Sequence, residues 1–440
     1  MKKIAFVCLI VMGLLVSCGQ GADKYTSPNG KVEVVVTPDS SALKYSVIYD
    51  GKVVLEPSVL GLVRGDADFS ALEIAGVESK TVEDSYVTPA EKKLNNSYKA
   101  NRVVFDVSNK KGNKMKIEFH IADNGVAFRY VFDEASEDEK VIEKELTSFR
   151  FPSEAKAWLH PHDDVKNCWA QTCPSYEDNY IVDVAVGTKA PKLAGWSFPA
   201  LFQSNGTWVL ITEAGLEPPY CGTRLGQNSD GGEYLIEFPQ KGETVKPADP
   251  ITPISKLPLS SPWRVLRLGG LNNIVENTMV TDVSEPSRIE NIDFVKPGIA
   301  AWSWGMEKDN SVNYDRQKQY IDYAADMSWD YVLVDALWDT VIGYERMQEL
   351  IDYAKAKNVK ILLWYNSAGD WNTTYQTPKD VLLNKESRRA EFERVSKMGA
   401  AGLKVDFWPG DGPSAIQYYY DMIQDAADYK LMLNFHGTTL

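Results

Sequence analysis

The chain has 440 residues, a formal net charge of −14, 44% hydrophobic residues and 25% charged residues. This length suits two or three domains, and the composition is that of a globular protein with a sizeable core. The negative charge argues against nucleic acid or an anionic membrane surface as a partner. The 12 Trp and 22 Tyr suit carbohydrate binding, because flat rings stack on the C–H faces of sugars, but composition alone does not establish it.

The first twenty residues predict a signal for export. "MKK" supplies positive charge, "IAFVCLIVMGLLV" an apolar run, and "VSCGQ" a region of small residues. The apolar run is too short for a good transmembrane span. "LLVSCG" resembles the lipobox of bacterial lipoproteins, so we expect Cys18 to become a lipid-modified first residue, in the periplasm or at the outer membrane. The alternative is an ordinary secretory signal in which Cys18 is incidental.

The cysteines and histidines give weaker signals. Without the signal the chain keeps Cys168, Cys173 and Cys221, and an odd count is not a disulfide framework. One bridge is possible in an oxidising compartment, but packed thiols are the favoured interpretation. His160 and His162 in "LHPHDD" are spaced like a metal pair. No third ligand is apparent, so we expect a surface turn there.

Residues 22–290 predict an antiparallel β-sandwich domain. Runs such as "KVEVVVTP" and "NRVVFDVSN" alternate or are rich in β-branched residues, and "YDGK" and "ADNGV" carry hairpin signals. Many short strands with such turns, and almost no convincing helix, are typical of a sandwich. The proline-rich stretch "KPADPITPISKLPLSSPW" is expected to be a crossing segment or linker.

Residues 291–440 predict a parallel β/α array. Apolar strands such as "YVLVDALWD", "VKILLWYNSAG" and "AGLKVDFWPG" alternate with amphipathic helices at intervals of about thirty residues. We count five strands and four helices, whereas a (β/α)8 barrel has eight of each. If this is a TIM barrel, the sequence stops after its fifth strand. A truncated gene model is preferred to a natural half-barrel, because half a barrel would leave unpaired edges.

Polar and aromatic residues gather where these five strands end. Barrel active sites lie at that face, assembled from several strand ends. Lys404 and Asp406 stand two residues apart on one predicted strand, so their side chains point to the same face. A lysine beside an aspartate favours the ionised carboxylate that a nucleophile needs. The alternative is an ion pair with no role beyond structure.

The order and spacing of these motifs resemble glycoside hydrolase family 97. The resemblance depends on "YVLVDALWD", "GLKVDFWPG" and "LNFHGTTL", behind a long β-domain and a lipoprotein-type signal. It implies an N-terminal β-super-sandwich followed by a (β/α)8 catalytic barrel. Retaining members, typified by α-galactosidases, carry an aspartate nucleophile at the end of the fourth barrel strand, which is the position of Asp406. Inverting members, typified by α-glucosidases, lack it there.

The same resemblance implies two further parts of the site. The general acid is expected to be a glutamate beyond residue 440, so a chain of these 440 residues is expected to be inactive by itself. A calcium ion is expected near that acid, with one ligand from the β-domain. Glu177 in "PSYEDNY" is the best match for this ligand, and Glu213 in "ITEAGL" is the weaker one. Calcium prefers several oxygen ligands, and most of the expected set is missing.

Other strand-end residues are predicted to bind substrate. Lys404 and Asp335 are expected to hydrogen-bond sugar hydroxyls, and Asp335 could instead cap the loop that follows it. His436 is a further candidate, with a loop-anchoring hydrogen bond as its alternative. Three tryptophans are candidate stacking platforms for a sugar ring, and the alternative for each is a packing role in the core: Trp338, Trp371 and Trp408.

Three functions are compatible with this sequence. The first is a retaining exo-α-glycosidase, most simply an α-galactosidase, which releases terminal sugars from oligosaccharides. The second is an α-glucosidase, because a sequence does not reveal the orientation of one hydroxyl. The third is a carbohydrate-binding lipoprotein without turnover, which gains weight if 440 residues is the true length. The oligomeric state is left open.

Overall fold

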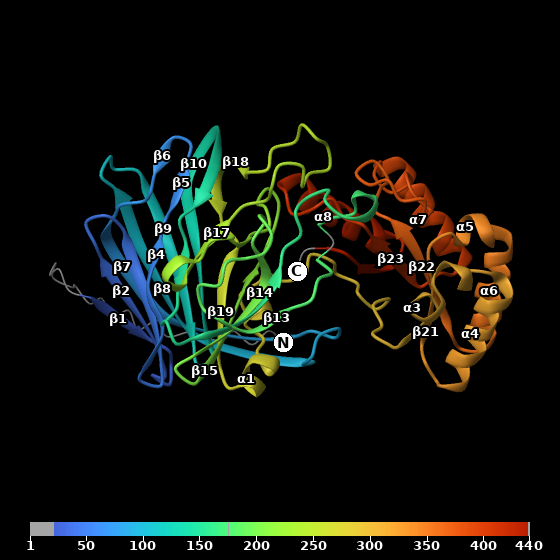
Figure 1. The fold of residues 1–440 in the computed structure, drawn as a ribbon, viewed down its shortest axis with the longest axis horizontal. Coiled ribbons are helices and arrows are strands. Elements are labelled where there is room, and N and C mark those ends of the chain that lie inside the picture. The colour runs from blue at the N-terminus through green and yellow to red at the C-terminus, as the bar shows by residue number, and fades with distance from the viewer. Residues whose placement is uncertain (1–21, 175, 439–440) are drawn as a thin grey trace, which may run out of the picture.

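The computed structural model describes residues 22–174 and 176–438. The predicted signal segment and the lipidation site at Cys18 lie outside the described residues. Figure 1 shows two parts, with long β-strands gathered at one end and a helix-rich part at the other. Among the described residues, no helix is both long and apolar enough to span a bilayer.

The first part is a large assembly of strands. Its neighbours pair antiparallel throughout the described residues, for example β2 with β3 and β9 with β10. Its strands are β1 (Asp23–Thr26), β2 (Val32–Pro38), β3 (Leu43–Tyr49), β4 (Lys52–Leu60), β5 (Leu62–Arg64), β6 (Ala67–Asp68), β7 (Leu72–Val87), β8 (Asn95–Asn109), β9 (Lys114–Ala122), β10 (Gly125–Glu145), β11 (Ser148–Arg150), β12 (Lys156–Pro161), β13 (Ile181–Ala185), β14 (Trp196–Ser204), β15 (Thr207–Ala214), β16 (Arg224–Leu225), β17 (Glu233–Glu237), β18 (Ile254–Ser260) and β19 (Trp263–Gly269).

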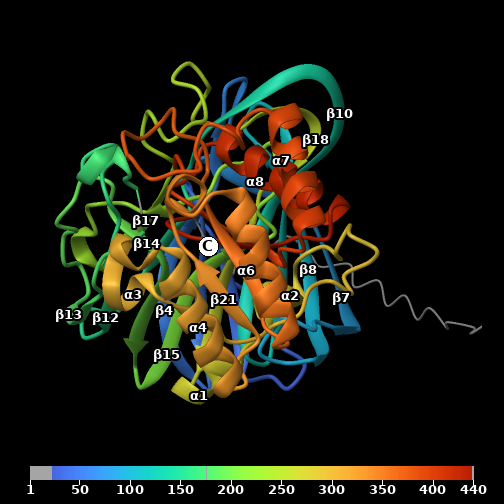
Figure 2. The same ribbon diagram turned by 90° about the vertical axis from the view of Figure 1, so that its right-hand side faces the viewer.

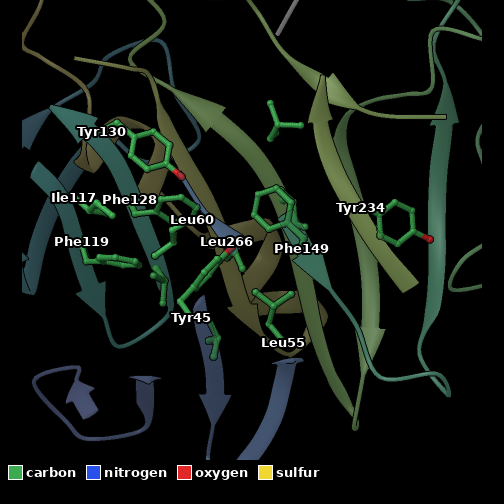
Figure 3. Packing of buried hydrophobic residues seen from close by; sticks show 14 of the residues in the cluster. Tyr45, Leu55, Leu60, Ile117, Phe119, Phe128, Tyr130, Phe149, Tyr234 and Leu266 are labelled. Carbon is green, nitrogen blue, oxygen red and sulfur yellow. The ribbon is translucent and has the colours of Figure 1, made fainter. Parts of the chain in front are cut away.

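Alternation of side chains explains why this part forms a sandwich-like core. In β2 the residues alternate between buried and partly exposed, as a strand with one covered face requires. The buried faces meet in an aromatic cluster, where Tyr45 lies 5.1 Å from Phe128 and Phe119 lies 5.2 Å from Phe128, between ring centroids (Figure 3). The antiparallel β-domain expected from the sequence is therefore present.

One expectation for this domain is wrong. The proline-rich stretch 246–263 is not only a crossing segment, because β18 and the start of β19 lie within it. Both strands pair with β10, which is 21 residues long. Pro258 fits because the register of β10 and β18 is irregular, and a proline, which cannot donate a backbone hydrogen bond, is tolerated at such places.

A buried ion network lies inside the β-domain. The Arg264 guanidinium pairs with the carboxylates of Glu145 and Glu213, and all three side chains are 3% exposed or less. Tyr220 donates a hydrogen bond to Glu145 at 2.7 Å, and Thr223 donates two to Glu213. Glu213, the weaker calcium candidate, is thus engaged by protein partners, which corrects that expectation.

The second part is built on a five-stranded parallel sheet, in the order β20-β21-β22-β23-β24. Its strands are β20 (Ala300–Trp302), β21 (Tyr331–Val334), β22 (Lys360–Asn366), β23 (Gly402–Asp406) and β24 (Met432–Phe435). The helices of the chain are α1 (Leu271–Glu276), α2 (Met279–Asp282), α3 (Trp304–Glu307), α4 (Tyr314–Asp326), α5 (Trp338–Val341), α6 (Tyr344–Ala356), α7 (Lys385–Met398) and α8 (Pro413–Asp428), with short 3-10 turns η1 (Trp169–Gln171), η2 (Asp230–Gly232) and η3 (Lys308–Ser311).

Local sequence explains where these helices begin and end. Asn313 and Asn384 cap α4 and α7 by accepting backbone N–H bonds, and Gly399 ends α7 in a left-handed conformation. The helices cover the sheet with their apolar faces, and α4 and α6 lie side by side over it (Figure 2). The parallel alternation of strands and helices expected from the sequence is confirmed over these five strands.

One buried contact between the two parts, which we call the joint, consists of Arg224, Glu243, Asp411 and Gly412. Arg224 donates to both carboxylate oxygens of Glu243, at 3.1 and 2.5 Å, and both side chains are 3% exposed or less. Glu243 in turn accepts the backbone N–H of Asp411 at 3.2 Å, and its carbonyl accepts that of Gly412 at 2.9 Å. The loop after β23 is therefore held by the β-domain.

Substitution of Gly410 tests how closely the joint is packed. A Cβ added there would lie 2.4 Å from Glu243 Cβ, and its φ of +134° is unfavourable for other residues. Gly410→Ala is therefore expected to lower the free energy of unfolding by about 1–3 kcal/mol. Gly76→Ala in β7, whose added Cβ would make contacts of 3.5 Å or longer, is the control. Equal midpoints of urea unfolding for the two variants would contradict this packing.

The structure also corrects two expectations about residues 160–173. Cys168 and Cys173 form a disulfide rather than packed thiols, because η1 folds the chain back and brings their Cα atoms to 5.5 Å. His160 and His162 are 6% and 1% exposed, so they do not form a surface turn. His162 is buried against Ser197 and Arg224, whose side chains contact its two ring nitrogens.

Candidate functional site

The charged residues of β23 meet at the carboxyl end of the parallel sheet. Lys404 and Asp406 lie beside Trp364 and Asn366 of β22 in register, and their side chains share one face of the strand. The Lys404 ammonium lies 3.3 Å from Asp335 and 3.5 Å from Asp406. All three charged side chains are almost completely buried. One cation therefore lies between two carboxylates in a site shielded from water.

Each oxygen of Asp406 has two partners. Its Oδ2 accepts the indole N–H of Trp364 at 3.0 Å and faces the Lys404 ammonium. Its Oδ1 accepts the backbone N–H of Phe407 at 2.9 Å and lies 3.3 Å from His436 Nδ1. The carboxylate is thus oriented from both sides.

These contacts decide the charge of Asp406. Burial would raise the pKa of its carboxyl, because a low-dielectric surrounding disfavours the anion. The hydrogen bond from His436 and the positive charge of Lys404 outweigh burial, so the pKa of Asp406 lies below its ordinary value. The group is an anion at neutral pH, which is the state that nucleophilic attack requires.

Asp335 lies at the opposite side of Lys404. Its Oδ2 accepts the indole N–H of Trp302 at 2.6 Å, and its Oδ1 accepts the backbone N–H of Ala336 at 2.9 Å. Lys404 also lies over the Trp302 ring, 4.5 Å from the centroid. Trp302 stacks on Trp304 at 5.4 Å. Indole rings and charged groups therefore border the same site.

His436 connects the sheet with the β-domain. Its Nδ1 lies 3.3 Å from Asp406 and 3.0 Å from Glu177 Oε1. The hydrogen bonds to Asp406 and Glu177 raise the pKa of His436 to about 9, although burial acts in the other direction. The imidazole is therefore a cation at neutral pH and shares its Nδ1 proton between two carboxylates.

This arrangement does not fit calcium. Glu177, Asp406 and His436 bring one ligand atom each within 4.8 Å of one another. Calcium takes six to eight oxygen ligands, whereas this set has an imidazole whose nitrogen carries the proton. Among the residues that the structure describes, Glu177 is engaged as a partner of His436, and calcium binding stays a prediction.

The structure contradicts the three predicted stacking tryptophans. Trp338, Trp371 and Trp408 are 0%, 7% and 1% exposed. Their indole N–H groups donate to backbone carbonyls, those of Trp364, Phe407 and Val405 respectively. Because their rings pack in the core, they offer no face to a sugar, and the alternative that they are packing residues is correct.

Sequence reasoning missed two contributors to the site. Trp302 and Trp364 contact Asp335 and Asp406 through their indole N–H groups. Trp302 ends β20, so the same strand-end argument could have found it. Trp364 lies two residues before the end of β22, and its role follows from register: it is the direct neighbour of Lys404 on β23. Without the pairing, its sequence position gave no signal.

The His436 pKa can be measured directly. NMR titration is expected to place it near pH 9, and Asp406→Asn or Glu177→Gln is expected to lower it towards 6.5. Because the folded pKa is the higher one, this contact contributes stability below pH 6.5 that is lost as pH rises through about 9. Asp326→Asn, an exposed position in α4, is the control. A titration near 6.5 in the unsubstituted protein would contradict the hydrogen bonds. A fall in the pKa on adding Ca²⁺ would show that Glu177 binds the ion.

Fold and site agree with the glycoside hydrolases as a class. Residues 25–286 match Glycosyl-hydrolase 97 N-terminal, and residues 294–440 match Glycoside hydrolase 97. The chain therefore belongs to glycoside hydrolase family 97.

Curated relatives share sequence over nearly the whole chain. It is 28% identical over 438 residues to a probable retaining alpha-galactosidase of Streptomyces bingchenggensis, covering 96% of this chain. It is also 28% identical over 475 residues to a retaining alpha-galactosidase of Bacteroides thetaiotaomicron, covering 100% of this chain. The chain spans 62% and 68% of the lengths of these two proteins.

Solved structures give the same fold. A beta-arabinopyranosidase superposes with a TM-score of 0.91 at 36% identity, covering 95% of this chain and 67% of that one. A family 97 enzyme of Pseudoalteromonas sp. strain K8, solved with acarbose, has a TM-score of 0.76 at 20% identity, covering 94% and 66%. The second similarity concerns the fold alone.

Proposed function

We propose that the full-length protein is a retaining exo-α-glycosidase for galactose-configured sugars and that Asp406 is its nucleophile. One observation carries this proposal: the Asp406 carboxylate is 6% exposed, is held by two contacts at each oxygen, and is kept ionised by His436 and Lys404. A carboxylate so oriented is suited to a single attack geometry.

In the proposed first step, an Asp406 oxygen attacks the anomeric carbon, and the bond from that carbon to the leaving oxygen breaks. A carboxylic acid on the other side of the sugar donates the proton that the leaving oxygen takes up. Water then attacks the glycosyl-aspartate, which releases the sugar with its original anomeric configuration. Lys404 and Asp335 are proposed to bind hydroxyls of the terminal sugar, which is supported by the position of Lys404 between Asp335 and Asp406.

The names of the relatives support two candidate sugars. Two are named as alpha-galactosidases, and a third is named as a beta-arabinopyranosidase. An α-D-galactopyranoside and a β-L-arabinopyranoside have the same ring configuration and differ by the hydroxymethyl group at C5. A single site that binds the ring and its hydroxyls could therefore accept both sugars. The space near C5 would then determine which of the two is preferred.

We also propose the remaining architecture and location. The five parallel strands are the first five of a (β/α)8 barrel, since each strand is followed by a helix before the next, with active-site residues at the carboxyl ends. The motif "LLVSCG" supports the proposal that a lipid on Cys18 anchors the protein in the cell envelope. Partition of the protein and of Cys18→Ser between detergent and water tests the anchor, and equal partition would overturn it.

Three nitrophenyl glycosides test the activity and the sugar. The full-length protein is expected to hydrolyse the α-D-galactopyranoside or the β-L-arabinopyranoside at least about a hundredfold faster, in kcat/KM, than the α-D-glucopyranoside. The glucoside lacks the axial 4-hydroxyl, so buried polar groups that bind this hydroxyl would be left unpaired. NMR of the first-formed sugar is expected to show retained configuration. Preference for the glucoside would support the α-glucosidase alternative, and no hydrolysis of any of the three would favour a binding protein.

A further inference from the structure

The β-domain segment around the disulfide reaches the carboxyl end of the parallel sheet. The carbonyl of Ala170 accepts the backbone N–H of Thr373 at 2.7 Å. The ammonium group of Lys166 donates to the carbonyl of Trp371. Both contacts are with the loop that follows β22. This segment includes the loop closed by the bridge, which we call the disulfide loop (Cys168–Cys173), and it is therefore docked beside the candidate site.

The disulfide loop holds its backbone in one shape. The Cys168–Cys173 bridge closes it, and the backbone N–H of Lys166 bonds to the carbonyl of Cys173 at 3.1 Å. The carbonyl of Trp169 accepts two hydrogen bonds from Thr172, from its backbone N–H at 3.1 Å and its hydroxyl at 2.8 Å. The backbone of Trp169 is therefore held in place by contacts within the protein, without a ligand.

The side chain of Trp169 is exposed although its backbone is fixed. It is 58% exposed, and its ring meets that of Phe407 edge to face at 6.4 Å. Phe407 follows Asp406 directly and packs at 5.6 Å against Trp364, whose indole N–H is bonded to Asp406. An exposed indole that contributes little to the core therefore stands at the edge of the Asp406 site.

The position of Trp169 assigns it to one part of the substrate. Lys404 and Asp335, to which the proposed function assigns the terminal sugar, are buried, whereas Trp169 lies at the exposed rim. In an exo-acting enzyme the sugar beyond the cleaved bond projects out past this rim. An indole face and the C–H face of a sugar are complementary apolar surfaces.

We propose that Trp169 is a specificity-determining residue, the stacking platform for the leaving-group sugar of the oligosaccharide. This inference rests on the proposed glycosidase function. It assigns to the β-domain a direct contact with substrate, made by an aromatic side chain that the disulfide and the loop after β22 hold in place.

Two substrates with the same glycone separate this role from the function itself. One is a disaccharide, 6-O-α-D-galactopyranosyl-D-glucose, and the other is α-D-galactosyl fluoride, which has no leaving-group sugar. The corresponding arabinosyl pair is used if that glycone proves the better one. In the full-length protein, Trp169→Ala is expected to lower kcat/KM for the disaccharide about tenfold and to leave that for the fluoride unchanged.

Matched variants complete the design. Trp169→Tyr is expected to recover most of the disaccharide activity, because it keeps an aromatic face. Tyr323→Ala, at an exposed aromatic of α4, is expected to change neither substrate. Thermal unfolding of Trp169→Ala is expected to match the unsubstituted protein. An equal loss of kcat/KM on both substrates in Trp169→Ala, or no loss on the disaccharide, would overturn the proposed stacking role of Trp169. Failure of the unsubstituted protein to cleave the fluoride would overturn the proposed function and this inference with it.

Discussion

Replacement of Asp406 by asparagine is expected to lower kcat/KM of the full-length protein about a thousandfold or more on every glycoside that it cleaves. An amide has nearly the shape of the carboxylate but cannot attack the anomeric carbon. The contacts from Trp364 and Phe407 to Asp406 would be retained in part, so the fold is expected to persist. Steady-state kinetics and circular dichroism measure the two effects separately.

Azide gives the decisive control. In Asp406→Gly, azide is expected to enter the space left by the carboxylate, attack the anomeric carbon and form a glycosyl azide of inverted configuration. Asp326→Asn, an exposed aspartate of α4, is expected to keep full activity. Undiminished hydrolysis by Asp406→Asn would exclude Asp406 as nucleophile. Inactivity without azide rescue, in a protein that remains folded, would leave only a binding or positioning role.

Replacement of Arg264 by methionine is expected to have the largest effect on stability. It removes the cation between Glu145 and Glu213 and leaves two buried carboxylates without their charge partner. Breaking a buried ion pair on one side costs about 3–5 kcal/mol. Urea unfolding followed by tryptophan fluorescence measures the change. Arg288→Met, which removes an exposed pair with Glu217, is the control and is expected to change stability by less than about 1 kcal/mol.

The pH dependence of the Arg264→Met effect has a definite sign. Burial raises the pKa of Glu213 above its ordinary value even with Arg264 present. A carboxyl whose folded pKa is raised binds more protons in the folded state, so its unfavourable effect shrinks as pH falls through that pKa. The stability deficit of Arg264→Met is therefore expected to be smaller at pH 5 than at pH 8. A deficit that is equal at both would show that lost packing, rather than charge, is its cause.

The parallel sheet and its charged end could be predicted because both follow from local sequence. Strands buried on both faces are continuously apolar, and Lys404 and Asp406 interrupt such a strand at its end. Parallel strands end at the same edge, which brings Asp335, Asp406 and His436 together from different strands or the loops after them. The position of each of these three residues could be predicted from the end of its strand.

The errors share a cause: the direction and partners of a side chain depend on tertiary packing. Trp338, Trp371 and Trp408 lie near strand ends as predicted, but they turn into the core rather than towards the site. The Cys168–Cys173 bridge depends on a 3-10 turn that has no strong sequence signal. The sequence around Glu213 suggests a calcium ligand, because it does not reveal that Arg264, 51 residues later, pairs with this carboxylate.

The joint has a consequence for how the two parts of this chain could be recombined with other domains. The backbone loop that follows Asp406 is completed by hydrogen bonds to Glu243, a residue of the other part of the chain. A parallel β/α part with a different N-terminal neighbour would lose these hydrogen-bond partners, and Glu243 would lose its contacts with the loop after β23. The two parts are thus not interchangeable modules: a gene fusion or a chimaera that replaced one of them would need to carry the joint across from both sides.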